Sequence, residues 1–441
     1  MVSTILLGIF AGDHGFKMNE VKEIETWQGK KHAVVTLFTD FNPHSLNNLF
    51  TIQLPAIYQN GNVPVITWEP KSSSNPNDIF RSINSGQHDQ YINDWALRLK
   101  QLIGNEKKVF IRFAHEVNLS DYQYSPNNGA SKDSPQDFVN AWRKVYTMFQ
   151  NKGLKAPQVK FIFCPNNSDK GKHKMELMYP GNEFIDWFGV DAYNFGHSEA
   201  WSVWLSAKDC TLPMINRLRV FSDSKPLALN EIATTSVAHP GKIVDLKMKG
   251  QWIKDMFQFA IDFRIGMISY FNIDKETDWG VFGYKYGTST YNGKNVYDEY
   301  KQSVQRPEFI SSVTSGNISP VPINPPKDGK LFISFHGTNL RGYPDGRVDL
   351  RPKSQEWEMW TFNYIGDSKF TWRSYFGTYL RANPNGTVDL AEIPKDWETW
   401  TKIEVGDRVV WKSFFGTYLS GNQNGTVQLV EKQDTWERWI S

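Results

Sequence analysis

The sequence predicts a (β/α)8 TIM barrel followed by an all-β trefoil domain, and three observations lead to this expectation. Over the first 305 residues, short apolar and β-branched segments alternate with amphipathic helical segments. Residues 306–326 are rich in proline, serine and asparagine, which is typical of a linker. From residue 327 onward, one sequence pattern occurs three times. We therefore expect a barrel over residues 1–305, a linker over 306–326 and a trefoil over 327–441.

Each barrel strand is predicted from an almost uninterrupted apolar segment, as expected for strands that are buried on both faces. The segments between them, such as 86–104 and 134–153, have apolar residues at helical spacing and end near a glycine. Eight strand–helix units within about 300 residues are typical of a TIM barrel. The predicted strands are residues 4–10, 32–41, 64–70, 109–116, 159–167, 184–194, 226–233 and 266–273.

The repeat in the last part of the chain predicts a closed, three-fold β structure. The segment GTNLRGYPDGRVDL (337–350) recurs as GTYLRANPNGTVDL (377–390) and as GTYLSGNQNGTVQL (416–429). Each copy contains an Asp-Gly or Asn-Gly hairpin turn and is followed by a WExW sequence, which we attribute mainly to core and corner packing. A unit of about 40 residues cannot bury its own apolar face, so all three must close together. The WExW sequences lie at residues 357–360, 397–400 and 436–439.

The composition excludes several partners and leaves the cellular location open. With 49 basic and 47 acidic residues and no basic stripe, we expect no nucleic-acid partner. No apolar run reaches 18 residues, so we expect no membrane span. The first apolar run is a poor signal peptide, so the protein is cytosolic or has lost a leader; we expect secretion with the leader absent from this chain. Cys164 and Cys210 form one disulfide bridge or are two free thiols.

The predicted site is the ring of strand ends, because TIM-barrel active sites lie at the C-terminal ends of the strands. Polar and aromatic residues gather there, as in a carbohydrate cleft rather than a phosphate or metal site. No His/Cys/Asp cluster has metal-ligand spacing, so we predict no metal, and no motif indicates a cofactor. The residues at these ends are Asp40, Trp68, Glu69, His115, Glu116, Asn166, Asn167, Asp191, Tyr193, Asn194, Asn230, Glu231 and Asn272.

Two of these carboxylates, Glu116 at the end of the fourth strand and Glu231 near the end of the seventh, match the needs of glycosidic cleavage. One carboxyl group must protonate the leaving oxygen, and the other must attack the anomeric carbon or activate water. A buried carboxylate beside a second one is pushed toward the protonated form, which suits the acid. A purely structural pair of glutamates would give the same spacing.

Four segments carry a family resemblance, and they are RFAHEVN (112–118), YPGNEFIDWFGVDAYN (179–194), KPLALNEIA (225–233) and FNIDKETDWGV (271–281). In this order they resemble glycoside hydrolase family 26, over roughly residues 4 to 300. The resemblance implies that Glu116 is the acid/base and Glu231 the nucleophile. It also implies that His115 contacts the nucleophile and the −1 sugar, and that Tyr193 orients the nucleophile. The repeat region resembles fascin-like trefoil modules.

The resemblance implies a retaining endo-β-glycanase, with departures that concern the substrate. Family members often continue the His-Glu pair as His-Glu-Met-Asn-Gly with a tryptophan soon after, whereas here Tyr122 or Tyr124 occupies that region. Near the eighth strand, family mannanases tend to carry a tryptophan, whereas this chain has Tyr270 and then Trp279. The family contains β-mannanases, mixed-linkage β-glucanases and β-1,3-xylanases. We place β-1,4-mannan or glucomannan first and the other two as alternatives.

Other residues are candidates for substrate binding, each beside a structural alternative. Trp68, Trp201 and Trp279 can stack on sugar rings or can pack in the core or against a helix. Asn118 contacts sugar or braces Glu116, and Tyr122 is the candidate for substrate binding among the two tyrosines near the family tryptophan's place. The alternative from another class is a non-catalytic carbohydrate-binding protein. The trefoil is expected to bind insoluble polysaccharide, although fascin-like modules also bind proteins, including actin.

Overall fold

The computed structural model describes residues 4–222, 224–313, 329–343, 345–353, 356–376, 378–391 and 394–440. The chain divides into two compact units, Met1–Val321 and Pro322–Ser441, and each is described by itself. Most of the predicted linker, residues 314–326, lies outside the described residues. None of the helices in the described part of the chain is long and apolar enough to cross a membrane.

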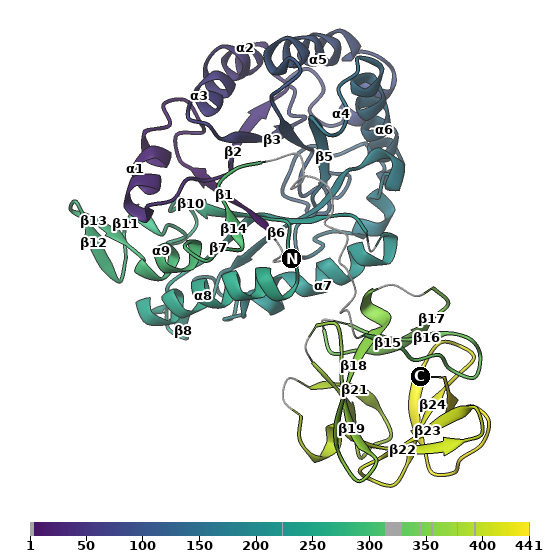
Figure 1. The fold of residues 1–441 in the computed structure, drawn as a ribbon. Coiled ribbons are helices and arrows are strands. Elements are labelled where there is room, and N and C mark those ends of the chain that lie inside the picture. Colours follow the sequence, from purple (N-terminus) through teal and green to yellow (C-terminus); the bar gives the residue numbers. More distant parts are fainter. Residues whose placement is uncertain are drawn as a thin grey trace. The chain divides into compact units, whose positions relative to one another are not determined.

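The first unit is a closed barrel of eight parallel strands surrounded by helices (Figure 1). Each strand pairs with the next one along the chain, and the last pairs with the first, so the sheet has no free edge within this ring. This confirms the predicted TIM-barrel architecture. The strands are β1 (Ile5–Ala11), β2 (Val34–Asp40), β3 (Val63–Glu69), β4 (Val109–Phe113), β5 (Val159–Phe163), β6 (Trp187–Asn194), β7 (Leu227–Thr234) and β10 (Met267–Asn272).

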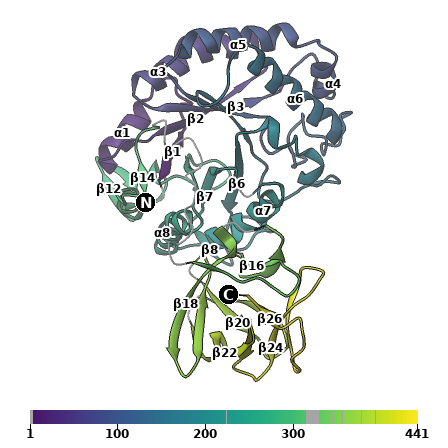
Figure 2. The ribbon, with the colours of Figure 1, turned by 45° about the vertical axis from the view of Figure 1, so that its right-hand side comes forward.

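Helices lie on the outside of the barrel, as Figure 2 shows for the segment from α1 to α6. The predicted helix at 134–153 is α6 (Pro135–Asn151), which begins with a capping box between Ser134 and Asp137 and has proline in its first turn. The others are α1 (Asn19–Gln28), α2 (Pro43–Asn48), α3 (Leu54–Gln59), α4 (Ile79–Asn84), α5 (Asp89–Ile103), α7 (Ala207–Phe221), α8 (Leu246–Asp262) and α9 (Asp298–Val304), with the π-helical turn η1 (Leu49–Gln53) and the 3-10 turns η2 (Met175–Met178) and η3 (Asn182–Phe184).

The barrel strands are buried on both faces, which explains their continuous apolar sequences. Every residue of β1, β4 and β7 is buried. Alternate residues face the helices, such as Leu7, or the barrel interior, such as Leu6. Gly8 lets β1 approach β2, because a side-chain Cβ there would come within 2.6 Å of Val34 Cγ2. The rigid wall of the barrel therefore fixes where each strand ends.

Short strands extend the first unit beyond the barrel. Most follow β7 or β10 and belong to the loops at the barrel's C-terminal end, whereas β14 pairs with β1. These short strands are β8 (Val237–His239), β9 (Ile243–Val244), β11 (Phe282–Tyr284), β12 (Ser289–Tyr291), β13 (Lys294–Val296) and β14 (Phe309–Ile310).

The second unit is all-β and contains the predicted repeats. Each repeat forms a hairpin, and the glycine of its turn has a φ between 86° and 90°, a conformation that favours glycine. The strands are β15 (Lys330–Leu331), β16 (Asn339–Gly342), β17 (Val348–Arg351), β18 (Met359–Gly366), β19 (Lys369–Arg373), β20 (Tyr379–Ala382), β21 (Val388–Ala391), β22 (Thr399–Val405), β23 (Arg408–Ser413), β24 (Tyr418–Gly421), β25 (Val427–Val430) and β26 (Arg438–Trp439).

The three hairpins are joined in a cycle by equivalent backbone hydrogen bonds. In each, a leucine N–H donates to the turn glycine of another repeat over 2.8 Å, and the pairs are Leu350 to Gly425, Leu390 to Gly346 and Leu429 to Gly386. Each repeat therefore contacts both others, as closure of incomplete units requires.

The two tryptophans of each WExW sequence have different surroundings. The second is fully buried in all three repeats, and its indole N–H donates over 2.9 Å to a leucine carbonyl. The first lies within a short 3-10 turn in two repeats and in a turn in the third, and its exposed fraction is 9% for Trp357, 40% for Trp397 and 42% for Trp436. Core packing thus accounts for the second tryptophan, while two of the first tryptophans lie at the surface.

Candidate active site

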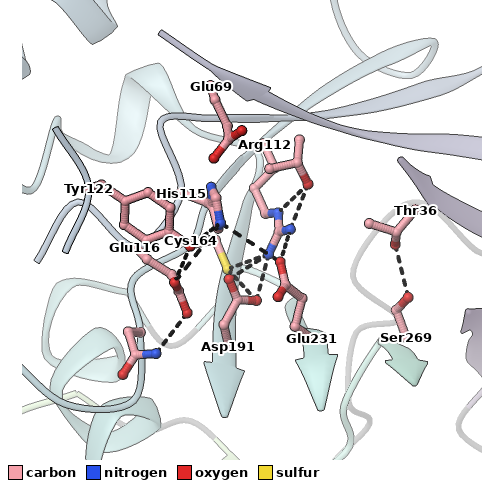
Figure 3. A network of polar contacts seen from close by, with 12 residues as sticks. Thr36, Glu69, Arg112, His115, Glu116, Tyr122, Cys164, Asp191, Glu231 and Ser269 are labelled. Carbon is pink, nitrogen blue, oxygen red and sulfur yellow. Dashed lines mark hydrogen bonds and ion pairs between the residues drawn. The ribbon is translucent and has the colours of Figure 1, made fainter. Parts of the chain in front are cut away.

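Two carboxylates and one imidazole meet at the C-terminal ends of β4 and β7 (Figure 3). His115 Nε2 lies 4.0 Å from Glu116 Oε2 and 3.9 Å from Glu231 Oε1. Each glutamate is only 5% exposed. The predicted catalytic pair is therefore brought to one place, on either side of His115.

The backbone after β4 turns sharply and directs Glu116 to this place. Ala114 and Glu116 have φ values of 46° and 51°, a left-handed conformation that side chains other than glycine rarely adopt. Hydrogen bonds on both sides hold the turn, since Ala114 N donates to Trp68 O over 2.9 Å and Glu116 N donates to Cys164 O over 2.8 Å. The neighbouring strands β3 and β5 thus fix the position of the glutamate.

Glu116 accepts two hydrogen bonds, which lower its pKa, but burial has the larger and opposite effect. Asn166 Nδ2 donates to its Oε1 and the Tyr122 hydroxyl donates to its Oε2, each over 2.7 Å. Burial, together with the charge of Glu231, raises the pKa of Glu116 to about 7. A carboxyl group with this pKa holds its proton near neutral pH and can give it to a leaving oxygen.

Glu231 differs from Glu116 because it is paired with a buried arginine. Its Oε1 accepts a hydrogen bond from Arg112 Nη2, and its Oε2 accepts one from the Tyr193 hydroxyl over 2.5 Å. Arg112 is fully buried and also binds both oxygens of Asp191, at 2.6 and 2.5 Å. The guanidinium cation stabilises the negative charge that a nucleophile needs.

Arg112 is a part of the site that the residue patterns did not assign, whereas Asp191 was expected among the strand ends but without this ion pair. Arg112 stands in the middle of β4, where both neighbours are apolar, and an arginine in a buried strand signals a buried ion pair. Asp191 faces Glu231 across the β6–β7 pair, after a register shift at Val190. Arg112 also donates to Thr67 Oγ1 at 3.0 and 2.6 Å, so the network reaches β3.

His115 is a neutral imidazole in this environment. Complete burial, together with the positive charge of Arg112, lowers its pKa well below the ordinary value. Its ring nitrogens lie 3.0 Å from the Tyr122 hydroxyl and 3.2 Å from the Tyr124 hydroxyl. The two tyrosines, stacked on each other with ring centroids 5.1 Å apart, thereby fix the orientation of the ring.

One group of residues has the composition of a metal site. Single ligand atoms of His115, Glu116 and Asp191 all lie within 4.8 Å of one another. Both oxygens of Asp191, however, are bound by Arg112, whose fixed positive charge repels a second cation. The arrangement fits an ion-paired carboxylate better than a metal ligand.

The other predicted binding residues have varied positions. Asn118 braces the loop after β5, because its Nδ2 donates to Asn166 O, Ser168 O and Asp169 Oδ1 at 3.0 to 3.1 Å. Trp201 is 72% exposed and contacts Phe195, with ring centroids 5.0 Å apart. Cys164 and Cys210 are both buried free thiols. The exposed ring of Trp201 is therefore a surface that a sugar can reach.

Trp68 and Trp279 are buried, which favours the packing alternative for both. Trp68 is fully buried and stacks on Trp95 at 4.6 Å, so it offers no face to a sugar. Trp279 is 1% exposed and packs against Tyr193 at 5.1 Å and Phe195 at 4.8 Å. A sugar platform needs an open face, and the side chains around these rings occupy that space.

A pocket adjoins the catalytic group on the side of β1 to β3. Its volume is about 200 Å³, and its lining includes His14, Phe38, Asp40 and Glu69. Phe38 contacts both His14, at 5.8 Å, and His115, at 5.7 Å, between ring centroids. In Figure 3 the Glu69 side chain lies near His115 and Arg112. The pocket is therefore next to the carboxylate pair.

A barrel mouth that holds one carboxyl group with a raised pKa and a second carboxylate paired with an arginine, on either side of an imidazole, has the chemistry of an O-glycosyl hydrolase. Comparison with known proteins agrees. Residues 55–207 match the family model described as Glycosyl hydrolase family 26, a segment that contains Glu116 and its partners but ends before β7.

The chain is also similar to a protein named Endoglucanase H from Acetivibrio thermocellus. The two are 26% identical over 272 residues, which is 59% of this chain and 27% of that protein. The match thus spans about a quarter of the relative's length. Together, the two comparisons show that the first unit is similar to glycosyl hydrolase family 26, and they support the enzyme class glycoside hydrolase.

Proposed function

We propose that the protein is a retaining endo-β-glycanase that hydrolyses the backbone of a β-linked polysaccharide by double displacement. The observation that carries this proposal is the contrast between the two carboxylates. Glu116 has a pKa of about 7, while Glu231 is ion-paired with Arg112. One group is thus prepared as an acid and the other as a nucleophile.

The reaction follows from these positions. Glu231 attacks the anomeric carbon while Glu116 gives its proton to the leaving oxygen, and a glycosyl ester forms on Glu231. Glu116, now ionised, takes a proton from water, which attacks the ester and releases the sugar with retained configuration. Tyr193 and Arg112 hold Glu231 in place through both steps. Tyr122 holds Glu116 and supports its ionised form.

The backbone sugar has three candidates. The family resemblance places β-1,4-mannan or glucomannan first, whereas the similarity to a protein named as an endoglucanase favours a β-glucan, including mixed-linkage β-glucan. β-1,3-Xylan is the third substrate. The pocket lined by Asp40 and Glu69 would take a neighbouring sugar of the same backbone, since its carboxylates can accept hydrogen bonds from pairs of hydroxyls. A neutral chain suits this lining better than an acidic one.

The second unit is proposed to be a β-trefoil that binds insoluble polysaccharide. Its cyclic three-fold hydrogen bonds and the three buried tryptophans support the trefoil assignment. The exposed Trp397 and Trp436 are flat apolar faces of the kind on which pyranose rings stack. Such a module would raise the local enzyme concentration at its substrate. We also propose that the protein is secreted and meets its polymeric substrate outside the cell.

A reducing-sugar assay tests the proposed activity. The wild type and Glu231→Ala are each given glucomannan, galactomannan, mixed-linkage β-glucan and β-1,3-xylan, with the exposed Glu106→Ala as the control. Release from one substrate by the wild type and the control, but not by Glu231→Ala, supports the proposal, and a rapid fall in polymer length supports endo action. No release from any of the four favours the non-catalytic binding protein instead.

A further inference from the structure

One buried lysine takes part in no step of the proposed reaction. Lys249 lies on α8 and is fully buried. Lysine is almost never fully buried without a partner, because removing its charge from water costs several kcal/mol in order of magnitude. Burial lowers the pKa of Lys249 to about 8, so the amine still carries its charge near neutral pH.

The Lys249 amine binds the backbone of the two residues that flank Trp279 in the sequence. Its Nζ donates to the backbone oxygen of Asp278 and, over 3.0 Å, to the backbone oxygen of Gly280. It also lies 3.4 Å from Asp278 Oδ2, which is its counter-ion. The loop after β10 is thus held by its backbone on each side of the tryptophan.

Asp278 joins the same loop to the strand that carries the nucleophile. Its carboxylate accepts hydrogen bonds from Ser236 N, at 3.0 and 3.1 Å, and from the Thr235 hydroxyl, at 2.6 Å. Thr235 and Ser236 directly follow β7, on which Glu231 lies. Lys249 therefore fixes the loop relative to β7 and not only to its own helix.

Trp279 transmits this position to the catalytic centre. Its ring packs against Tyr193 with centroids 5.1 Å apart, and the Tyr193 hydroxyl donates to Glu231 Oε2 over 2.5 Å. Because Trp279 is 1% exposed, it acts on Tyr193 rather than on a sugar. A shift of the tryptophan would leave Tyr193 free to turn away from the nucleophile.

We propose that Lys249 is a positioning residue for catalysis, which holds Trp279 against Tyr193 and thereby holds Glu231 in its attacking orientation. This inference rests on the proposed function, because it concerns the same nucleophile. Lys249 does not touch substrate, so its loss should lower kcat with little change in KM. A misplaced catalytic group lowers the rate about 100-fold, whereas the sugar-binding surfaces remain.

The test compares Lys249→Met with Lys30→Met, in the full chain. Lys30 is a matched control, because its amine also donates to two backbone oxygens, Val304 O at 2.7 Å and Arg306 O at 3.2 Å, but away from the carboxylate pair. We expect Lys249→Met to lose about 10- to 100-fold in kcat, while Lys30→Met keeps the wild-type kcat. Equal kcat values for both variants would overturn the proposal.

A double-mutant cycle separates positioning from general loss of stability. If Lys249 acts through Tyr193, then Lys249→Met should cost little further kcat once Tyr193→Phe has removed the contact with Glu231. Independent losses that multiply would contradict this path. Trp279→Phe, which keeps both backbone contacts of Lys249, provides a second route if Lys249→Met folds poorly, and it should give the same kcat-selective loss.

A crystal structure of Lys249→Met gives a readout that does not depend on activity. The proposal predicts that Tyr193 moves out of hydrogen-bond distance of Glu231, and an unchanged contact would refute it. An inactive wild type with a displaced Tyr193 in the variant would instead reject the proposed activity and keep the positioning role.

Discussion

The Tyr122 hydroxyl donates a hydrogen bond to Glu116 Oε2 over 2.7 Å, and the same hydroxyl lies 3.0 Å from His115 Nε2. This bond favours the ionised form of Glu116 and lowers its pKa, against the larger effect of burial. Glu116, the proposed acid, therefore has a pKa of about 7, set by opposing contributions that can be changed one at a time.

Tyr122→Phe should move the alkaline limb of the pH–rate profile upward. Without the hydrogen bond, the pKa of Glu116 rises above about 7, so the acid keeps its proton to higher pH. The limb in kcat/KM should shift by about half to one pH unit. Tyr124→Phe is the control, because the Tyr124 hydroxyl binds His115 O and not Glu116. A limb that stays in place, or moves to lower pH, would argue against Glu116 as the acid.

Glu116→Gln should stabilise the protein at alkaline pH while abolishing activity. The folded-state pKa of Glu116 lies above its ordinary value, so its contribution to stability is present at low pH and is lost as pH rises through about 7. Glutamine avoids this cost, and the free energy of unfolding at about pH 8 should rise by about 1–3 kcal/mol. Urea unfolding at about pH 8 and about pH 4 measures it. The gain should vanish at the lower pH, and a gain of equal size at both would point to another cause.

Arg112→Met should destabilise the barrel strongly, because it leaves Asp191 and Glu231 as buried charges without their cation. Breaking a buried ion pair by removing one partner costs about 3–5 kcal/mol. Chemical denaturation measures the loss. Arg112→Met combined with Asp191→Asn removes one of the two unpaired charges, so the double variant should be more stable than the single one. A double variant of lower stability would mean that packing, and not charge, dominates.

The two tryptophans of one WExW sequence should behave differently when replaced. Trp400 is fully buried, so Trp400→Ala should cost about 3–5 kcal/mol of stability. Trp397 is 40% exposed, so Trp397→Ala combined with Trp436→Ala should keep the melting temperature. The double substitution of Trp397 and Trp436 should instead weaken the retention of a Glu231→Ala chain on insoluble polysaccharide, measured by pull-down. Retention that is unchanged by this pair would leave a spacer or protein-binding role for the second unit.

The barrel could be predicted from sequence because its strands are buried on both faces. Continuous apolar segments such as 226–233 correspond to strands such as β7, and the closed order of pairing follows from eight such units. The three repeats could be recognised in the sequence because each hairpin turn requires a glycine, which recurs in every copy. The predicted helical segment 134–153 agrees with α6, whose first turn is capped by Ser134.

The details of the site could not be predicted, because they depend on contacts across long sequence separations. Arg112 meets Asp191 and Glu231 across 79 and 119 residues, and no local pattern encodes that meeting. Burial of Trp68 depends in the same way on Trp95 from α5. The roles of the predicted catalytic and binding residues stay predictions until they are measured.

Trapping of the glycosyl-enzyme intermediate tests the central claim most directly. The wild type is incubated with 2-deoxy-2-fluoro glycosyl fluorides of cellobiose and mannobiose, and the labelled peptide is identified by mass spectrometry. The account predicts one sugar per chain, attached to Glu231, and no label on Glu231→Gln. A label on Glu116 or on another carboxylate, or no label on an enzyme that cleaves mannan or β-glucan, would contradict it.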